Sequence, residues 1–467
     1  MGTRYLYFLV CIVFAHAIGS AQHNISIDAD FDTDSKIISI QQQITYVNTS
    51  SDILTKIYFH DWANSFSGKT TPLGKRFAED FIKKFYKAKK HELGWTHIED
   101  ITDTEKKPLD WGRENGIHDI LWIESPTPIH PGEQQTFKLT YKVKIPSDKF
   151  TRYGYHGDKK FNLKYWHIVP AVYTTKWNIF SHKNLDDLYT PISNYQITLT
   201  LPQEYQLTTE LQQEDLTVSE ENNSKTVKLW GNKRNEVKIY LELENSFYAY
   251  PSNGIQYVSN IDDDGLQDGP KSSTINRILT FLNKRLGPYP FDKILVSEND
   301  YKSNPVYGLN QLPDIVRPFP DGFQYEIKQL KVITEKYLER TLLTNPRYDA
   351  WIKDAIHIHL IMAYTQQYYP DMKIIGKLSK VIGIRWYRLA DLKFNDQYYI
   401  GYKNMMRLFL DQSLSLPQDE LVKFNKNIAN AYKAGVGLKY LEDYLGDDNI
   451  INESITCLLY TSDAADD

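Results

Sequence analysis

The sequence predicts a mixed fold, in which an N-terminal antiparallel β domain is followed by a mostly helical domain. From His23 to about Glu244, apolar and polar residues alternate between turn residues, which is typical of strands with one buried face. From Asp321 to Tyr444, the apolar residues follow a helical period instead. With 467 residues, 41% of them hydrophobic and 24% charged, the chain has an ordinary globular composition and is long enough for two or three domains.

Composition also narrows the classes of partner and chemistry. The net charge of −5 is too small to favour nucleic acid or a membrane surface as a partner. The sequence contains no Gly-rich phosphate loop, no Gly-x-Ser-x-Gly nucleophile elbow and no Cys-x-x-Cys pair. We therefore expect no nucleic-acid partner and none of the chemistries that these motifs carry.

Residues 1–21 are predicted to be a secretory signal peptide. An arginine near the start precedes an apolar run from Tyr5 to Ile18, and small residues end the segment at Ala21. A transmembrane anchor is the alternative, but the run is too short and no basic residue follows it closely. No later segment is long and apolar enough to span a bilayer. We therefore expect the mature protein to be secreted, in a periplasm or outside the cell.

The other end of the sequence, residues 456–467, is expected to be a sequencing-adapter artefact. Its letters "CLLYTSDAADD" resemble the translation of such an adapter, so we expect the natural chain to continue beyond about residue 455. The only two cysteines, Cys11 and Cys457, lie in the two excluded ends. A mature chain without them has no disulfide and must be stabilised by its core.

The predicted β domain covers residues 22–247. Alternating segments are separated by turn residues, and a basic segment at about 74–95 has a helical period and is interpreted as an insertion on the sheet. The predicted strand-forming segments are 25–48, 194–202, 207–221 and 226–245.

The predicted second domain covers residues 248–455. It begins with a helix whose apolar face runs from Ile275 to Leu286 and which Gly287 ends. The segment "DKILVSEND" then predicts a strand, and the largely helical remainder closes at Gly446.

Five stretches, in the right order, resemble the membrane alanyl aminopeptidase family of gluzincin zinc peptidases, most closely its bacteroidete-like members. The stretches are "WHIVPAVYTTKW", "LGPYPFDKILV", "GLNQLP", "TNPRYDAWIKDA" and "AYKAGVGLKYLEDYLG". The resemblance implies a thermolysin-like α+β second domain and a cleft. It also implies a zinc ion held by two histidines of a His-Glu-x-x-His helix and by a carboxylate nineteen residues later.

The ungapped alignment shows that the family's zinc motif is degenerate in this chain. Lys331 takes the place of the first histidine, Val332 that of the catalytic glutamate, Glu335 that of the second histidine and Asp354 that of the third ligand. A lysine ammonium cannot donate a lone pair to zinc, and a valine cannot accept a proton from water.

Two further positions complete the site that the resemblance implies. Gln311 takes the place of the glutamate that binds the free amino group of a peptide substrate, and has lost its charge. Tyr432 takes the place of the tyrosine that stabilises the oxyanion, and is the one position of the set that is kept.

The sequence therefore favours a secreted, aminopeptidase-like protein that has lost zinc and peptidase activity, has no cofactor and binds peptides or another protein. In this hypothesis the Lys331 ammonium stands where the zinc would be, and Glu335 and Asp354 form ion pairs with it. The alternative is an active zinc aminopeptidase that holds its metal in another way. Two weaker readings are metal-free acid–base catalysis by Tyr432 beside the two acids and a routine, solvated pair between Lys331 and Glu335.

Overall fold

The computed structural model describes residues 22–114, 117–183, 186–262, 266–307, 309, 318–383 and 386–464. They form two compact units. The N-terminal unit takes residues 22–183 and 188–245, and the C-terminal unit takes residues 186–187 and 246–463. The first is rich in strands and the second is mostly helical, so the predicted mixed fold class is confirmed.

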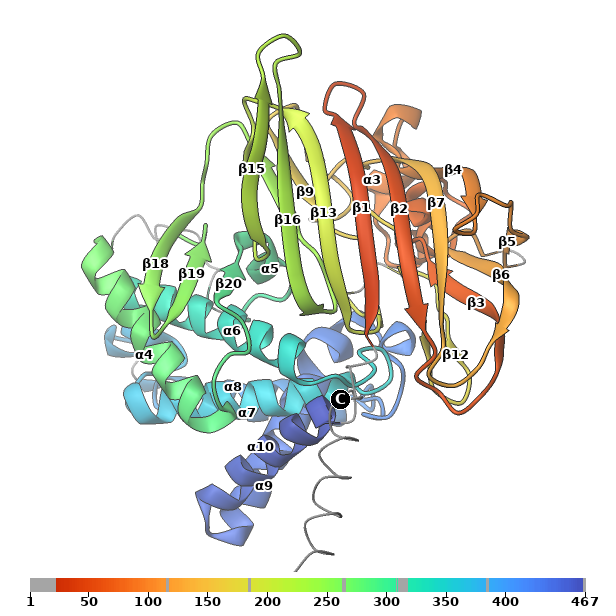
Figure 1. The fold of residues 1–467 in the computed structure, drawn as a ribbon. Helices are drawn as coiled ribbons and strands as arrows, with labels where there is room; N and C mark the ends of the chain where they lie inside the picture. The colour runs from red at the N-terminus through yellow and green to blue at the C-terminus, as the bar shows by residue number, and fades with distance from the viewer. Residues whose placement is uncertain are drawn as a thin grey trace, which may run out of the picture. The chain divides into compact units, whose positions relative to one another are not determined.

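The N-terminal unit is built around a seven-stranded sheet of order β15-β16-β13-β1-β2-β7-β4 (Figure 1). All neighbours are antiparallel except β1 and β13, which run parallel. In β1 every second residue is buried, which is the alternation that the sequence predicted. The strands are β1 (His23–Asp32), β2 (Ile37–Val47), β4 (Trp95–Thr102), β7 (Gln134–Lys144), β13 (Ser193–Pro202), β15 (Gln212–Ser219) and β16 (Ser224–Arg234).

Smaller sheets and short helices complete this unit. The segment with the helical period forms short helices and not one long one, because the chain turns at Phe81, which has a φ of 57°. The helices of this segment are α2 (Pro72–Glu79), α3 (Lys83–Tyr86) and η2 (Lys90–Glu92), and η1 (Trp62–Phe66) precedes it. One four-stranded sheet has the order β10 (Val169–Pro170), β3 (Leu54–His60), β6 (Ile120–Ile129) and β5 (Trp111–Arg113). The other has the order β14 (Gln206–Thr209), β17 (Ile239–Glu242), β9 (Lys160–Leu163) and β8 (Gly154–His156). β11 (Val172–Tyr173) and β12 (Trp177–Asn178) pair separately.

The C-terminal unit packs helices around a three-stranded sheet of β18 (Tyr248–Ser252), β19 (Ile255–Ser259) and β20 (Lys293–Val296). The predicted stops at Gly287 and Gly446 are confirmed, since both cap a helix with a positive φ. The helices are α4 (Asp268–Leu286), α5 (Glu298–Ser303), α6 (Asp321–Thr341), α7 (Ala350–Tyr368), α8 (Asp396–Arg407), α9 (Asn430–Leu445) and α10 (Asp448–Ala464), with shorter η3 (Gly376–Lys380), η5 (Arg388–Ala390), η6 (Gln418–Glu420) and the π-helical η7 (Asn425–Ala429).

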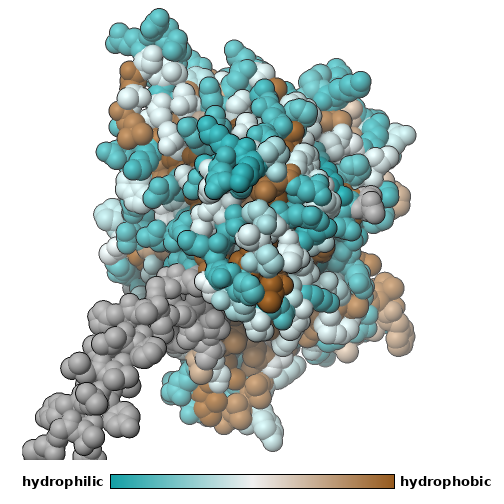
Figure 2. Space-filling model, turned by 45° about the vertical axis from the view of Figure 1, so that its right-hand side comes forward, coloured by the Kyte–Doolittle hydropathy of each residue, from teal (hydrophilic) through white to brown (hydrophobic). Residues whose placement is uncertain are grey.

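The surface seen in Figure 2 is mostly hydrophilic, with hydrophobic side chains in separate groups. Such groups are usual on protein surfaces. Within the part of the chain that the structure describes, no helix has both the length and the apolar character needed to cross a bilayer.

Candidate functional site

The C-terminal unit brings most of the predicted site residues onto three helices. Lys331, Val332 and Glu335 lie on α6, Asp354 lies on α7 and Tyr432 lies on α9. The prediction for Gln311 falls outside the described residues.

The link between α6 and α7 is fixed by one buried arginine. The guanidinium of Arg347 donates to both carboxylate oxygens of Asp187, from Nε at 2.6 Å and from a terminal nitrogen at 3.1 Å. The backbone N–H of Gln418 donates to the carbonyl of Arg347 at 3.0 Å. A bidentate pair of this kind has one preferred geometry. It therefore fixes where α7 begins, and with it the position of Asp354.

Lys331 is a buried cation whose side chain makes one hydrogen bond to the described residues. Its side chain lies inside the unit, and the residue is only 6% exposed. Nζ donates to Oδ1 of Asn304, the residue that follows α5, at 3.2 Å. Burial lowers the pKa of Lys331 to about 8, although the charges of Glu335 and Asp354 act in the opposite direction. The ammonium form is therefore less favourable here than in water.

Glu335 pairs with a different lysine from the one that the sequence suggested. Its Oε1 lies 3.5 Å from Nζ of Lys353 on α7. Among the ion pairs of the described residues, none joins Lys331 to Glu335 or to Asp354, so the predicted direct pairs do not form. Lys353 lies next to Asp354 in the sequence, but a helical period alone does not show which of the two residues faces α6. The sequence therefore could not predict that Glu335 pairs with Lys353.

Asp354 is partly buried beside both lysines. Burial raises the pKa of its carboxyl to about 6, and the charge of Glu335 acts in the same direction. Lys353 and Lys331 oppose this shift. We call Lys331, Glu335, Lys353 and Asp354 the Lys331 cluster. The charges of its two acids and two lysines interact, although only Glu335 and Lys353 are within ion-pair distance.

Val332 and Tyr432 both lie in the hydrophobic core of the unit. The Tyr432 ring meets that of Tyr398 edge to face at 4.8 Å between centroids, and it packs so closely on Gly401 that a β-carbon there would meet the ring at 2.5 Å. Burial raises the pKa of the Tyr432 hydroxyl above its usual value. The side-chain contacts recorded for Tyr432 are therefore packing contacts.

Two histidines of α7 point to different neighbours. His357 Nε2 donates to the carbonyl of Lys331 at 3.0 Å, and burial keeps the pKa of its ring well below the usual value. His359 Nε2 lies 3.6 Å from Glu442 of α9. The two residues lie two positions apart on α7, so their rings point in different directions.

The fold of the chain is similar to that of solved zinc peptidases. The M1 zinc metallopeptidase from Deinococcus radiodurans matches with a TM-score of 0.54 and 11% identity, over 94% of this chain and 85% of that chain. A mutant of that enzyme bound to a Tyr-Ser-Ala substrate matches with a TM-score of 0.55, and a two-domain M1 zinc metallopeptidase mutant bound to L-arginine with 0.53, at the same identity and coverage.

The chain has the M1 zinc metallopeptidase fold. No protein-family model and no curated protein matches its sequence. A structural match at 11% identity establishes the fold of this chain. Its chemistry depends on the residues at its own site.

The Lys331 cluster does not fit a zinc ion. Zinc in proteins is held by three or four His, Cys, Asp or Glu side chains. Among the described residues, no group of three such side chains is placed to hold a metal. Glu335 and Asp354 supply two carboxylates, while the two neighbouring ammonium groups repel a dication. We assign no metal-dependent step to this cluster.

One feature near the cluster had no signal in the sequence. The π-helix η7 runs directly into α9, and Lys426 within it acts electrostatically on Asp354. Single π-helical turns often occur at functional sites. Sequence periodicity cannot show one, because it differs from an α-helix by one residue in one turn.

Proposed function

We propose that the chain is a secreted protein of the M1 fold that has lost zinc binding and peptide hydrolysis, and that acts by binding peptides or another protein. The observation that carries this proposal is the buried Lys331 ammonium, which lies on α6 one helical turn from Glu335 and is sensed electrostatically by Asp354. In the family that the sequence resembles, these positions belong to zinc ligands.

Charge supports the loss of the metal. A cation beside Glu335 and Asp354 already offsets their negative charge, so a zinc ion would have to displace or deprotonate Lys331 before it could bind. Lys353 adds a second positive group, paired with Glu335. The two acids are therefore compensated without a metal.

The missing base supports the loss of hydrolysis. Val332 is an apolar core residue at the position of the catalytic glutamate. Without a carboxylate there, no group at that position can take a proton from an attacking water. Tyr432, the one kept residue, could stabilise an oxyanion only after a nucleophile had attacked the carbonyl.

The test is metal analysis of the purified chain together with hydrolysis of aminoacyl-p-nitroanilides. The proposal predicts substoichiometric zinc after dialysis against zinc-containing buffer, and no hydrolysis that 1,10-phenanthroline abolishes. One zinc per chain with chelator-sensitive turnover would replace the proposal with the second candidate, an active zinc aminopeptidase. The fold match to M1 zinc metallopeptidases favours that candidate.

A further inference from the structure

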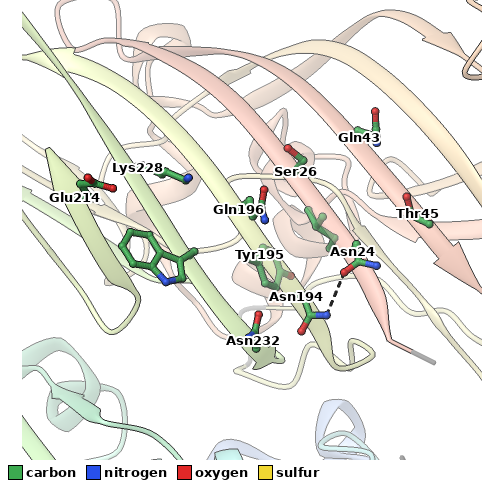
Figure 3. A pocket seen from close by; sticks show the side chains of 12 residues that line it. Asn24, Ser26, Gln43, Thr45, Asn194, Tyr195, Gln196, Glu214, Lys228 and Asn232 are labelled. Carbon is green, nitrogen blue, oxygen red and sulfur yellow. Dashed lines mark hydrogen bonds between the residues drawn. The ribbon is translucent and has the colours of Figure 1, made fainter. Parts of the chain in front are cut away.

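The N-terminal unit carries a hollow on the solvent-facing side of its seven-stranded sheet. The hollow has a volume of about 610 Å³ and is lined by residues of β1, β2, β13, β15 and β16. Figure 3 shows Gln196, Ser26 and Gln43 on three neighbouring strands of this face. It lies wholly within one unit and shares no residue with the Lys331 cluster.

Strand register places a row of side chains across the hollow. Trp230 of β16 lies opposite Gln196 of β13, Gln196 lies beside Ser26 of β1, and Ser26 lies opposite Gln43 of β2. All four residues are exposed. Neighbouring strands are roughly 4.8 Å apart, so the row extends for about 14 Å. That length suits a short chain of linked rings.

The polar side chains of this row are uncharged and available for hydrogen bonds to a ligand. Within the described part of the chain, the side chains of Ser26, Gln43 and Gln196, and of Asn232 elsewhere in the lining, make no hydrogen bond to protein. Carboxamides and hydroxyls both donate and accept hydrogen bonds. Such a surface therefore complements a ligand whose groups also do both, as sugar hydroxyls do.

Other side chains at the end of the hollow are held in place. Asn194 Nδ2 donates to Oδ1 of Asn24 at 3.1 Å (Figure 3), and the N–H of Lys233 donates to Oδ1 of Asn194 at 3.2 Å. The two charged lining residues, Glu214 and Lys228, lie opposite each other in the register, so the lining as a whole is neutral. A charged ligand gains no net attraction here.

An exposed indole stands at one end of the row. Trp230 is 37% exposed and lies in register with Gln196 on one side and Gln212 on the other. A flat aromatic ring flanked by amides can stack on the C–H face of a sugar ring while the amides bind its hydroxyls. A tryptophan left in water without such a ligand is an unfavourable exposure of apolar surface.

We propose that this hollow binds a neutral polysaccharide, with Trp230 stacking on one sugar ring and Gln196, Ser26 and Gln43 hydrogen-bonding the rings that follow. The site is independent of the Lys331 cluster and of any hydrolysis there.

Affinity electrophoresis in native gels tests the proposal. The probes are soluble starch, galactomannan, xyloglucan and mixed-linkage β-glucan, with polygalacturonate as an acidic counterpart. Asn24 begins an Asn-Ile-Ser sequence, which some hosts glycosylate, so the chain is made in a host without N-glycosylation. At least one neutral polysaccharide is expected to retard the chain, and polygalacturonate is not.

Variants locate the binding. Trp230→Ala is expected to weaken polysaccharide binding by about tenfold or more, because a tryptophan that becomes buried on binding usually contributes most of the affinity. Gln196→Ala is expected to weaken it a few-fold, as for one neutral hydrogen bond. Tyr86→Ala removes an exposed aromatic ring elsewhere in the unit, and Gln213→Ala removes an amide from the other face of β15. Both should bind as the unchanged chain does.

Circular dichroism melting confirms that each variant is folded. The proposal is overturned if no neutral polysaccharide retards the chain, if polygalacturonate alone does so, or if Trp230→Ala binds as well as Tyr86→Ala. Capture of a protein through Trp230, without polysaccharide binding, would also overturn it and would assign the face to a protein partner.

Discussion

Among the buried charged residues of helix α6, Glu326 and Lys331 lie five residues apart and have very different surroundings. Glu326 is 1% exposed, and each of its carboxylate oxygens accepts two hydrogen bonds. Arg277 and Tyr364 donate to one oxygen and Arg277 and Tyr369 to the other. Lys331 is 6% exposed, and within the described part of the chain its side chain hydrogen-bonds only to Asn304.

The comparison indicates that the buried charge of Glu326 stabilises the fold, whereas the buried charge of Lys331 adds little to its stability. A fully hydrogen-bonded charge such as Glu326 pins α4, α6 and α7 together. The Lys331 ammonium makes one hydrogen bond to the described residues, burial lowers its pKa, and Glu335 and Asp354 act on it without forming an ion pair. We interpret Lys331 as a residue at the position of the zinc site of the family that the sequence resembles, and Glu326 as part of the structural core.

The largest expected effect comes from breaking the satisfied charge. Glu326→Ala leaves Arg277 and two tyrosine hydroxyls without their acceptor, and should lower the free energy of unfolding by about 3–5 kcal/mol. Urea unfolding measures this. Glu298→Ala, which removes an exposed pair with Lys302, is the control and should cost less than about 1 kcal/mol. Equal losses in the two variants would contradict the structural role of Glu326.

The second effect appears in alkaline solution. Between pH 8 and the ordinary lysine pKa of 10.5, the unfolded chain binds more protons at Lys331 than the folded chain does, so stability should rise with pH. Lys331→Met removes this contribution, which amounts to at most about 3 kcal/mol over that range.

Unfolding of the two proteins at pH 8, 9 and 10 gives the comparison. Lys328→Met removes a lysine from the same helix and is the matched control. If both variants change the pH dependence equally, the buried state of Lys331 is not its cause.

The smallest effect concerns Lys353, which lowers the pKa of Asp354 and pairs with Glu335. The Asp354 pKa of about 6 exceeds its unfolded value, so its contribution to stability is lost as pH rises through 6. In Lys353→Met that pKa rises further, and the loss should continue above pH 6. The stability difference from the unchanged chain should therefore grow by about 1 kcal/mol between pH 5 and 8.

Unfolding at four pH values in this range measures that difference. Lys302→Met, an exposed lysine of α5, should give a difference that does not change with pH. A flat difference for Lys353→Met as well would show that Lys353 does not act on the two acids.

The sequence predicted the helices of the site because their periodicity is local. The helical period predicted from Asp321 onward is confirmed by α6, which holds residues 331, 332 and 335, and by α7, which holds residue 354. Alternation likewise predicted β1 and β2, where each outward residue follows an inward one.

The partners could not be predicted in this way. Arg347 meets Asp187 across 160 residues, and Asn304 reaches Lys331 from the end of a different helix. Such contacts depend on how far each helix is rotated about its axis, and a difference of one position decides whether Lys353 or Asp354 faces Glu335. Patterns along one segment do not contain that information.

The most direct test is anomalous diffraction at the zinc absorption edge from crystals soaked in zinc. A variant that carries Lys331→His, Val332→Glu, Glu335→His and Asp354→Glu restores the donor spacing of a zinc peptidase and serves as the positive reference. The variant should show an anomalous peak among these positions, and the unchanged chain none. A zinc peak in the unchanged chain between Glu335 and Asp354, with the Lys331 side chain turned away, would contradict the account.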